Sequence, residues 1–503
     1  MIKSVRLLAL LFFLVLSDLV SGQGLRNSDD FDIRIVARGL SDPWEVIYGP
    51  DDFLWVTESK GYRVQRIDPS SGEKKVLIDL SRMRQFPRYD KMDDTMDGGK
   101  PWPQGGLMGM ALHPMLLEGK PFVYLAYVYR YKGAGEAGDG KKGAEGYQFL
   151  ARIVRYQYNP PTGTLTDPQI LHDSIPASND HNGGRLLIAP QKGAFFLFYS
   201  TGDMGAGQFS NGGRTNHAQE VNSYEGKILR FNLAPDLSDS PWIPDDNPFN
   251  ARHESAVWSV GHRNPQGLAH ASIGGRDFLY STEHGPYSDD EVNLIEGGAN
   301  YGHPLIIGYA DGNYDGLAAS VSDRGELPGP WNTSYPLIQN EIKSSRALPA
   351  YRDPIFSFYP TSARDLRALF ENVRNKEETD WESYAPSSVA VYQADAIPGW
   401  NSSLLIPTLK GGRLLRLKLD NEGRVSDSTV YEYANGKARY RDVAISKDGK
   451  KIFLAVDSSS ITSGPSEENP TGISYRGSII ELKYNPKVRQ DASGALARLP
   501  LLE

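Results

Sequence analysis

Val64-Gln-Arg-Ile-Asp-Pro69 is a short β-type run that ends in a polar turn, and the same pattern recurs five more times along the chain. Two short apolar runs precede this copy, at residues 45–48 and 53–57, and equivalent pairs precede the other copies. The other copies are residues 153–160, 228–233, 292–295, 414–420 and 479–486. Six sets of at least three strands predict an all-β fold, a six-bladed β-propeller, because radial repetition keeps sheet edges short and protected. A pair of β-sandwich domains would not be expected to repeat one strand order six times.

The composition fits one large β domain. The chain has 503 residues, of which 39% are hydrophobic and 23% charged, so it can bury a large core. Its 51 glycines and 33 prolines predict many turns rather than long helices. A net charge of −8 argues against a nucleic-acid partner bound to a basic surface. The absence of cysteine excludes disulfides, zinc–thiolate sites, iron–sulfur sites and cysteine nucleophiles.

The N-terminal segment has the order of features of a secretory signal peptide. Lys3 and Arg6 precede an apolar run at residues 7–16, and small residues follow at Val20-Ser21-Gly22. The run is too short for a stable membrane anchor, which needs about 20 residues. We therefore expect a signal peptide at residues 1–22, a propeller domain at residues 23–503, and an exported protein that is periplasmic or secreted.

Two regions interrupt the strand rhythm. Residues 133–147 are rich in Gly, Lys and Glu and are predicted to form a hairpin loop. Residues 311–382 form a long, proline-rich interval between the fourth and fifth strand sets. Within it, residues 361–376 are the only stretch of the chain that we predict to be helical.

Polar residues gather where a propeller places its ligand. One mouth of the central channel is formed by the loops that lead into each innermost strand and by the loops that follow each second strand. The first group of loops carries Gln104, Asp180, His181, Asn182, Arg263, Asn264, Trp381, Ser383, Arg439 and Arg441. The second group carries Asp203, Gln208, Gly285, Pro286, Lys410 and Asp457.

Four of these residues are cations in a protein of negative net charge: Arg263, Lys410, Arg439 and Arg441. Their convergence predicts an anion with several oxygens, because packed cations repel one another and lose hydration. A phosphate compound and a small polycarboxylate both suit this pattern. The alternative is that the cations pair with acids such as Asp442 or Asp457.

His181 is the strongest candidate for a general base. Imidazole accepts a proton near neutral pH, and Asp180 or Asp203 could orient the ring. No histidine pair has a convincing zinc spacing, and no serine lies in a nucleophile elbow. Oxygen ligands around Gly285, Pro286 and residues 288–291 favour calcium over transition metals. Residues 311–316 begin like a calcium loop, but the twelfth position is a serine, so this is not an EF-hand.

Seven motifs together resemble the soluble quinoprotein glucose dehydrogenases, over residues 33–483. The motifs are Gln104-Gly-Gly-Leu-Met-Gly, Asp180-His-Asn-Gly-Gly-Arg-Leu, Gly261-His-Arg-Asn-Pro-Gln-Gly, Gly285-Pro-Tyr-Ser-Asp-Asp-Glu, Ala385-Pro-Ser-Ser, Leu409-Lys-Gly-Gly and Arg439-Tyr-Arg-Asp. The resemblance implies a six-bladed propeller that binds pyrroloquinoline quinone (PQQ) and calcium and oxidises aldose sugars at C1 to the lactone. PQQ carries three carboxylates and would supply the anion that the four cations require.

The resemblance also implies roles for individual residues. His181 would take the proton of the sugar C1 hydroxyl, Asp203 would orient it, and Arg263 would stabilise developing negative charge. The implied PQQ contacts are Arg263, Asn264, Trp381, Ser383, Lys410, Arg439 and Arg441. The implied sugar contacts are Gln104, Asp180, His181, Gln208, Phe209 and Trp381. The implied calcium ligands are Gly285 and Pro286 beside the quinone, and Glu291, Tyr301, Ile307, Tyr309 and Asp311 at structural sites.

The expected partners are a sugar and an electron acceptor other than NAD or oxygen, such as a quinone, a dye or a small redox protein. A homodimer is also compatible with the resemblance. Three positions depart from the family pattern and leave the sugar open: Glu378, where an aromatic residue is usual, Asn182, and the acidic segment 90–97. Two other functions remain as alternatives. One is a calcium-dependent propeller hydrolase of the lactonase type, and the other is a non-catalytic extracellular binding propeller.

Overall fold

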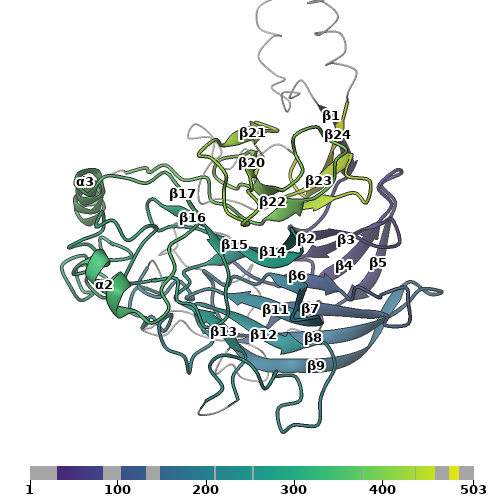
Figure 1. Cartoon of the computed structure of the whole chain (residues 1–503), viewed down its shortest axis with the longest axis horizontal. Helices are drawn as coiled ribbons and strands as arrows, with labels where there is room; N and C mark the ends of the chain where they lie inside the picture. Colours follow the sequence, from purple (N-terminus) through teal and green to yellow (C-terminus); the bar gives the residue numbers. More distant parts are fainter. Residues whose placement is uncertain are drawn as a thin grey trace, which may run out of the picture.

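The computed structural model describes residues 31–82, 104–131, 148–208, 211–251, 254–377, 379–436, 438–458 and 475–485. Within these ranges the strands form six antiparallel four-stranded sheets, which confirms the predicted six-bladed propeller (Figure 1). The predicted signal peptide, the predicted hairpin loop at 133–147 and Phe209 lie outside the described residues. No helix in the described part of the chain is long and apolar enough to cross a membrane.

Five blades are continuous in sequence, and each runs outward from its first strand. The first two are β2 (Pro43–Tyr48), β3 (Leu54–Glu58), β4 (Arg63–Ile67) and β5 (Lys74–Asp79), then β6 (Leu107–Leu112), β7 (Phe122–Tyr131), β8 (Phe149–Asn159) and β9 (Thr164–Ala177). The next two are β10 (Leu186–Gln191), β11 (Ala194–Thr201), β12 (Lys227–Asn232) and β13 (Val257–Val260), then β14 (Pro265–Ile273), β15 (Arg276–Glu283), β16 (Asp290–Leu294) and β17 (Phe356–Phe358). The fifth is β18 (Ala390–Tyr392), β19 (Ser403–Pro407), β20 (Leu414–Lys418) and β21 (Tyr431–Tyr433).

The sixth blade joins the two ends of the chain. Its strands β22 (Tyr440–Ile445), β23 (Lys451–Val456) and β24 (Ser478–Tyr484) come from the C-terminal region, and its outer strand is β1 (Phe31–Ala37). β1 pairs antiparallel with β24, so that Phe31 lies opposite Tyr484 (Figure 1). The Arg34 Nε lies 2.7 Å from Glu481 Oε1 across this pair. The ring is therefore closed by backbone hydrogen bonds between its first and last strands.

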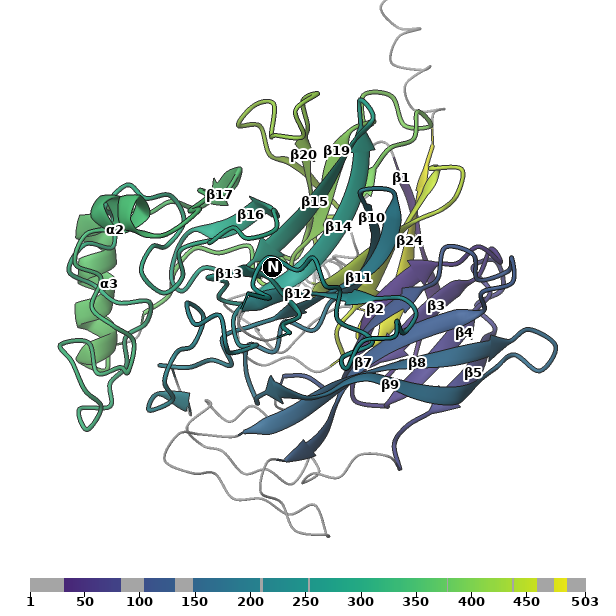
Figure 2. The same cartoon turned by 60° about the horizontal axis from the view of Figure 1, so that its bottom comes forward.

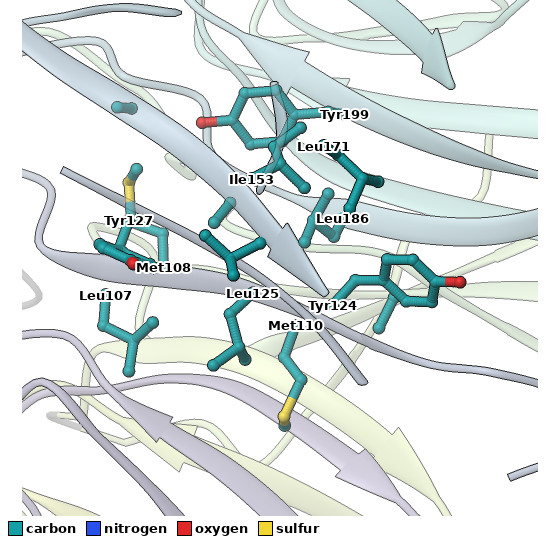
Figure 3. Close-up of a cluster of buried hydrophobic side chains, with 14 of the residues drawn as sticks. Leu107, Met108, Met110, Tyr124, Leu125, Tyr127, Ile153, Leu171, Leu186 and Tyr199 are labelled. Carbon is teal, nitrogen blue, oxygen red and sulfur yellow. The ribbon is translucent and has the colours of Figure 1, made fainter. Parts of the chain in front are cut away.

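Buried side chains between neighbouring blades form the core. Leu107 and Met110 of β6, Leu125 of β7 and Ile153 of β8 pack together with Leu186 and Tyr199 of the next blade (Figure 3). All six are at most 3% exposed. An adjacent blade covers each face of a sheet, so both faces are buried. This explains why the strands appear in the sequence as apolar runs.

Arg185, immediately before β10, lies at the centre of the ring and is 1% exposed. Its Nη1 is 2.7 Å from Glu45 Oε2 in β2 and 3.1 Å from Asp442 Oδ2 in β22. The same guanidinium donates to the carbonyl oxygens of Gln266 in β14 (2.9 Å) and Ser387 before β18 (3.1 Å). One side chain therefore connects its own blade to four others.

The charges around Arg185 are strongly buried. Burial raises the pKa of Glu45 well above its usual value, Arg185 opposes this shift, and Asp442 adds to it. Two buried carboxyl groups thus share one guanidinium, and their stability there depends on its charge.

The long interval between the fourth and fifth strand sets is more structured than predicted. The helix expected at 361–376 is confirmed as α3 (Ala363–Arg374), but a second helix, α2 (Glu341–Ala347), shows that the prediction of a single helix was wrong. α2 is short and begins at Asn340, whose side chain accepts a hydrogen bond from Lys343 N. Both helices lie on one side of the molecule, near β16 and β17 (Figure 2).

We predict that Arg185→Met destabilises the fold by about 3–5 kcal/mol, because it leaves Glu45 and Asp442 buried without a counter-charge. The loss should be greater at pH 8 than at pH 5, since unpaired buried carboxyls have raised pKa values and are neutral at the lower pH. Urea unfolding at both pH values measures the loss of stability.

Arg63→Met is the control. The Arg63–Asp79 pair has side chains 45% and 41% exposed, so its loss should cost at most about 1 kcal/mol. Equal effects of the two variants would contradict this role of Arg185.

Candidate active site

The loops predicted to form one mouth of the channel do meet in the structure. Asp203 N donates to Arg263 O at 2.7 Å, and Gly183 N donates to the Asn264 side chain at 3.1 Å. Gln208 contacts Asp180, His181 and Arg263. These residues come from the loops before β10 and β14 and the loop after β11, so the prediction that distant segments converge here is confirmed for them.

The hydrogen bonds around Gln208 determine the tautomer of His181. Arg263 can only donate, and its Nη2 lies 3.0 Å from Gln208 Oε1, so the amide nitrogen of Gln208 faces the other way. That nitrogen is 2.9 Å from Asp180 Oδ2 and 2.8 Å from His181 Nε2. Because the amide donates, His181 Nε2 accepts and carries no proton. His181 Nδ1 then donates to Asp203 Oδ1 at 2.7 Å. His181 is therefore held as a neutral imidazole with a basic Nε2.

Asp203 is a fully buried carboxylate. Burial alone would raise its pKa, but hydrogen bonds from His181 and His303, together with the positive charge that these rings carry when protonated, outweigh burial and hold the pKa well below the usual range. Asp203 consequently remains ionised next to the imidazole. This is the arrangement that stabilises a histidine when it gains a proton.

Glu283, the last residue of β15, fixes the loop that carries Arg263. Its Oε2 accepts from the backbone N–H groups of Arg263 (2.8 Å) and Asn264 (3.3 Å), and its Oε1 lies 3.0 Å from His262 Nδ1. Arg263 Nη1 in turn donates to His284 O at 3.1 Å. The Arg263 side chain is thus held from both its backbone and its guanidinium.

The predicted cations lie around this centre, and some have acidic partners. Asp457 pairs with Arg441 at 2.8 Å and with Arg439 at 3.7 Å, so one of the two acids proposed as partners does bind these cations. Asp442 instead pairs with Arg185. Lys410 Nζ is 2.7 Å from Asp380 Oδ1 and 4.9 Å from the centre of the Trp381 ring. Burial lowers the pKa of Arg439 to about 10.

The pKa of His284 is affected by the positive charges around the mouth. Burial, followed by the charge of Arg263, that of His181 when it is protonated, and those of Arg441 and Arg439, holds the pKa of His284 well below its usual value. Two donors of this region, Arg263 Nε and Asn264 Nδ2, are buried without a hydrogen-bond partner in the part of the chain that the structure describes. Buried donors rarely stay unpaired. A ligand with several oxygen acceptors would satisfy them and balance the cations.

Lys60 is a further, half-buried cation of this region that the sequence did not single out. It follows β3 and donates to Gly105 O at 2.8 Å, next to Gln104. Burial lowers the pKa of Lys60 to about 8, and the charge of Arg441 contributes in the same direction. Its position in the sequence could have identified it. Lys60 lies in the loop after the second strand of its blade, and the equivalent loops of other blades supply Asp203, His284, Lys410 and Asp457. Gln104 itself is held by the backbone, with its N donating to Asn179 O at 2.8 Å.

The predicted calcium loop at Gly285 and Pro286 is tightly shaped. Gly285 N donates to Asp290 Oδ1 at 3.1 Å, and a Cβ at Gly285 would lie 1.7 Å from Ser288 O, so only glycine fits. Asp290 Oδ2 accepts from Ser383 Oγ at 2.7 Å. This carboxylate therefore places Ser383, a predicted PQQ contact, beside the Gly285 loop.

Two buried carboxylates hold the loop with the predicted structural calcium ligands Ile307, Tyr309 and Asp311. Glu291 accepts from Gly308 N at 2.9 Å, and Glu341 accepts from Ile307 N at 2.9 Å and Gly312 N at 3.0 Å. Burial, Glu283 and Asp289 raise the pKa of Glu291 well above its usual value. Burial raises the pKa of Glu341 to about 7. Carboxylate and carbonyl oxygens of this kind are the donors that calcium uses.

Other parts of the calcium prediction are weaker. In the described ranges no three His, Cys, Asp or Glu side chains are grouped as a metal site, so a site here depends on backbone oxygens. The Tyr301 hydroxyl donates to Leu294 O at 2.6 Å. Glu341 was not predicted, because it lies in the interval that the sequence analysis left without strands. The only sequence signal was Asn340-Glu341, which is typical of a helix start.

With this geometry established, comparison with known proteins identifies the family. The model of the glucose/sorbosone dehydrogenase family matches residues 40–356 and 371–462. The chain belongs to the glucose/sorbosone dehydrogenase family. The match covers the loops that carry His181, Asp203, Arg263 and Arg439.

Individual relatives agree with this assignment. Quinoprotein glucose dehydrogenase B of Acinetobacter calcoaceticus is 31% identical over 495 residues, covering 92% of each protein. Aldose sugar dehydrogenase YliI of Escherichia coli (strain K12) is 25% identical over 436 residues, covering 85% of this chain and 91% of its own. The PQQ-bound structure of aldose sugar dehydrogenase from Streptomyces coelicolor has the same fold, with a TM-score of 0.57 and 23% identity over 91% of this chain and 100% of its own.

For this glucose/sorbosone dehydrogenase family member, Glu341 predicts a specific pH dependence. Folding raises its pKa from an ordinary value of about 4.3 to about 7. Between these values the folded carboxyl binds more protons than the unfolded one, so its contribution to stability falls as the pH rises from about 4.5 to about 7. With a calcium chelator present, wild type should therefore lose stability relative to Glu341→Gln between pH 5 and pH 7.5.

Urea unfolding at the two pH values, with chelator, measures this difference. Glu296→Gln is the control, because Glu296 pairs with Arg352 at the surface with 47% of its side chain exposed. A difference between wild type and Glu341→Gln that stays constant with pH would contradict the raised pKa.

Proposed function

We propose that the protein is a PQQ- and calcium-dependent dehydrogenase that oxidises an aldose at C1 to the lactone. The observation that carries the proposal is the state of His181. Its Nε2 carries no proton and is bound by the Gln208 amide, which also contacts Arg263, in a region where the charges of Arg263, Arg439 and Arg441 act together on His284. A base beside a positive pocket suits the removal of a proton from a neutral hydroxyl next to an anionic cofactor.

The residues around the mouth fit a tricarboxylate cofactor. Arg263 Nε and Asn264 Nδ2 need acceptors, and Lys60, Arg439 and Arg441 contribute positive charge, with Asp457 paired to both arginines. Lys410, Trp381 and Ser383 lie on the fifth-blade side, where Ser383 is tied to the Gly285 loop through Asp290. These residues would hold PQQ, and the carbonyls of Gly285 and Pro286 would face its calcium. When bound, PQQ supplies the two-electron acceptor and calcium supplies positive charge beside it.

The protein's own contribution is to hold and move one proton. His181 Nε2 accepts the proton of the sugar C1 hydroxyl, and the imidazolium that forms keeps its Nδ1–H on Asp203 Oδ1. Asp203 remains ionised throughout, because its other oxygen is already hydrogen-bonded. Gln208 must release His181 Nε2 when the sugar enters, and its amide can then bind a sugar hydroxyl together with Asp180 and Gln104.

The two alternative functions explain less of the site. A lactonase-type hydrolase needs a metal and a base but does not need several buried cations. A binding propeller does not need an imidazole fixed in its basic tautomer by a buried carboxylate. We further propose that the protein is exported and passes electrons to a quinone, a dye or a small redox protein. The features supporting export are the N-terminal charge and apolar run of the sequence.

Reconstitution tests the cofactor. Apoprotein mixed with calcium and PQQ should reduce an artificial dye when an aldose is added. NAD should not replace PQQ, since the G-x-G-x-x-G runs at residues 133–143 lie in the predicted hairpin loop and do not lead from a strand into a predicted helix. Chelation should abolish the activity and lower the melting temperature, because a ligand that binds only the folded state stabilises it. Glucose, disaccharides and uncommon aldoses should be compared. Failure to bind PQQ at micromolar concentration would overturn the proposal.

His181→Ala separates catalysis from cofactor binding. It should reduce turnover by about 10²–10⁴-fold, because it removes the proton acceptor, while PQQ binding and its absorption spectrum persist. Arg439→Ala should instead weaken PQQ binding, because it leaves a cofactor carboxylate without a charged partner. Spectroscopic titration and steady-state kinetics measure both effects. Near wild-type turnover by His181→Ala with PQQ bound would show that the base lies elsewhere.

A further inference from the structure

The second oxygen of Asp203 is bound by residues that the sequence analysis did not connect with catalysis. Asp203 Oδ2 accepts from Tyr335 Oη at 2.6 Å, His303 Nε2 at 2.8 Å and Asn216 Nδ2 at 3.1 Å. Asp203 Oδ1 accepts from His181 Nδ1 and from Gly205 N at 3.0 Å. The carboxylate thus has one oxygen for the base and another for a separate set of donors.

Tyr335 belongs to a segment that holds the whole catalytic turn. Thr333 Oγ1 donates to Gly207 O, Ser334 N donates to Gly212 O at 3.2 Å, and Ser334 Oγ donates to Arg214 O at 2.6 Å. The Tyr335 ring covers Gly207 so closely that a Cβ there would lie 2.3 Å from it. Residues 333–335 therefore bind the turn that carries Asp203 and Gln208, although they lie in the interval between the fourth and fifth innermost strands.

His303 contacts Asp203 from a different direction. It follows β16, its N donates to Gly261 O at 3.0 Å, and its ring meets that of Tyr335 edge to face at 5.6 Å. A carboxylate only accepts, so the Nε2 of His303 donates to Asp203. His303 and Tyr335 are 4% and 5% exposed, so both contacts are shielded from bulk solvent.

We propose that His303 and Tyr335 are positioning residues that set the basicity of His181 through Asp203, a role that rests on the proposed function. Their hydrogen bonds draw negative charge to Oδ2 and prevent rotation of the carboxylate. Less charge is left on Oδ1 to stabilise the imidazolium of His181. Loss of either donor therefore makes His181 more basic, and its pKa rises.

The other groups that face this pair do not change in the test. Asp180 reaches His181 through Gln208, Arg263 reaches it through the same amide, and His284 responds to the charge of His181 when His181 is protonated. All three remain in the variants described below, so a shift can be assigned to the donor that was removed.

Tyr335→Phe keeps the ring over Gly207 and removes only the hydroxyl, whereas His303→Leu removes the imidazole donor. Each should raise the pKa of His181 by ~0.5–1 unit, since a hydrogen bond to a charged group shifts a pKa on this scale. In the reconstituted enzyme the acid limb of the kcat/KM profile should move to higher pH by the same amount. His303→Gln should restore the wild-type profile, because its amide nitrogen can donate to Oδ2.

The pKa of His181 is measured in the calcium-free and PQQ-free protein by NMR of ¹⁵N-labelled histidine, so the readout is independent of turnover. Tyr280→Phe is the matched control, because Tyr280 is a buried tyrosine whose hydroxyl donates to Gly423 O at 2.9 Å, far from this carboxylate in its hydrogen-bond network. A His181 pKa unchanged in Tyr335→Phe and His303→Leu, or shifted equally by Tyr280→Phe, would overturn the proposal. A shifted pKa in a protein that oxidises no sugar would instead overturn only the proposed function.

Discussion

The buried charge of Arg185 is the interaction on which the ring depends. A propeller whose innermost strands diverge from one centre leaves polar backbone and acidic side chains facing that centre, and these groups need a partner there. Arg185 bonds to two acids and two carbonyls from four other blades. The same residue ends the Asp180–Arg185 segment, so the loop that supplies the base is anchored at the point where the blades meet.

Buried carboxylates likewise anchor the loops around the site. Asp203, Glu283, Asp290 and Glu341 each accept hydrogen bonds from the backbone of a functional loop or from its side chains. The loops therefore have little freedom even though they are irregular. Such fixed dipoles and charges are what a catalytic site uses, because they need not reorganise when charge develops.

Much of the fold could be predicted from the sequence, because three strands of every blade carry apolar runs at regular positions. The fourth strands could not, since β21 is short and largely exposed and β17 lies inside a long irregular interval. β1 was missed because its partner is at the other end of the chain. At the site, the blade pattern and motifs located His181, Asp203 and Arg263. They did not locate His303, Tyr335 or Glu341. These residues reach the site from the long interval between strands, whose path over the propeller the strand pattern does not predict.

The pairing of β1 with β24 has a consequence for biosynthesis. Arg34 and Glu481, which join across this pair, are 447 positions apart. During translation β1 emerges first and must wait for nearly the whole polypeptide before its partner exists. Contacts this distant in sequence form slowly, because the chain entropy of joining the ends opposes them. Until then Phe31 lacks the aromatic neighbours Tyr433 and Tyr484 that bury it. The nascent propeller is thus an open arc with two unpaired edges, and its last step of folding is the meeting of its ends.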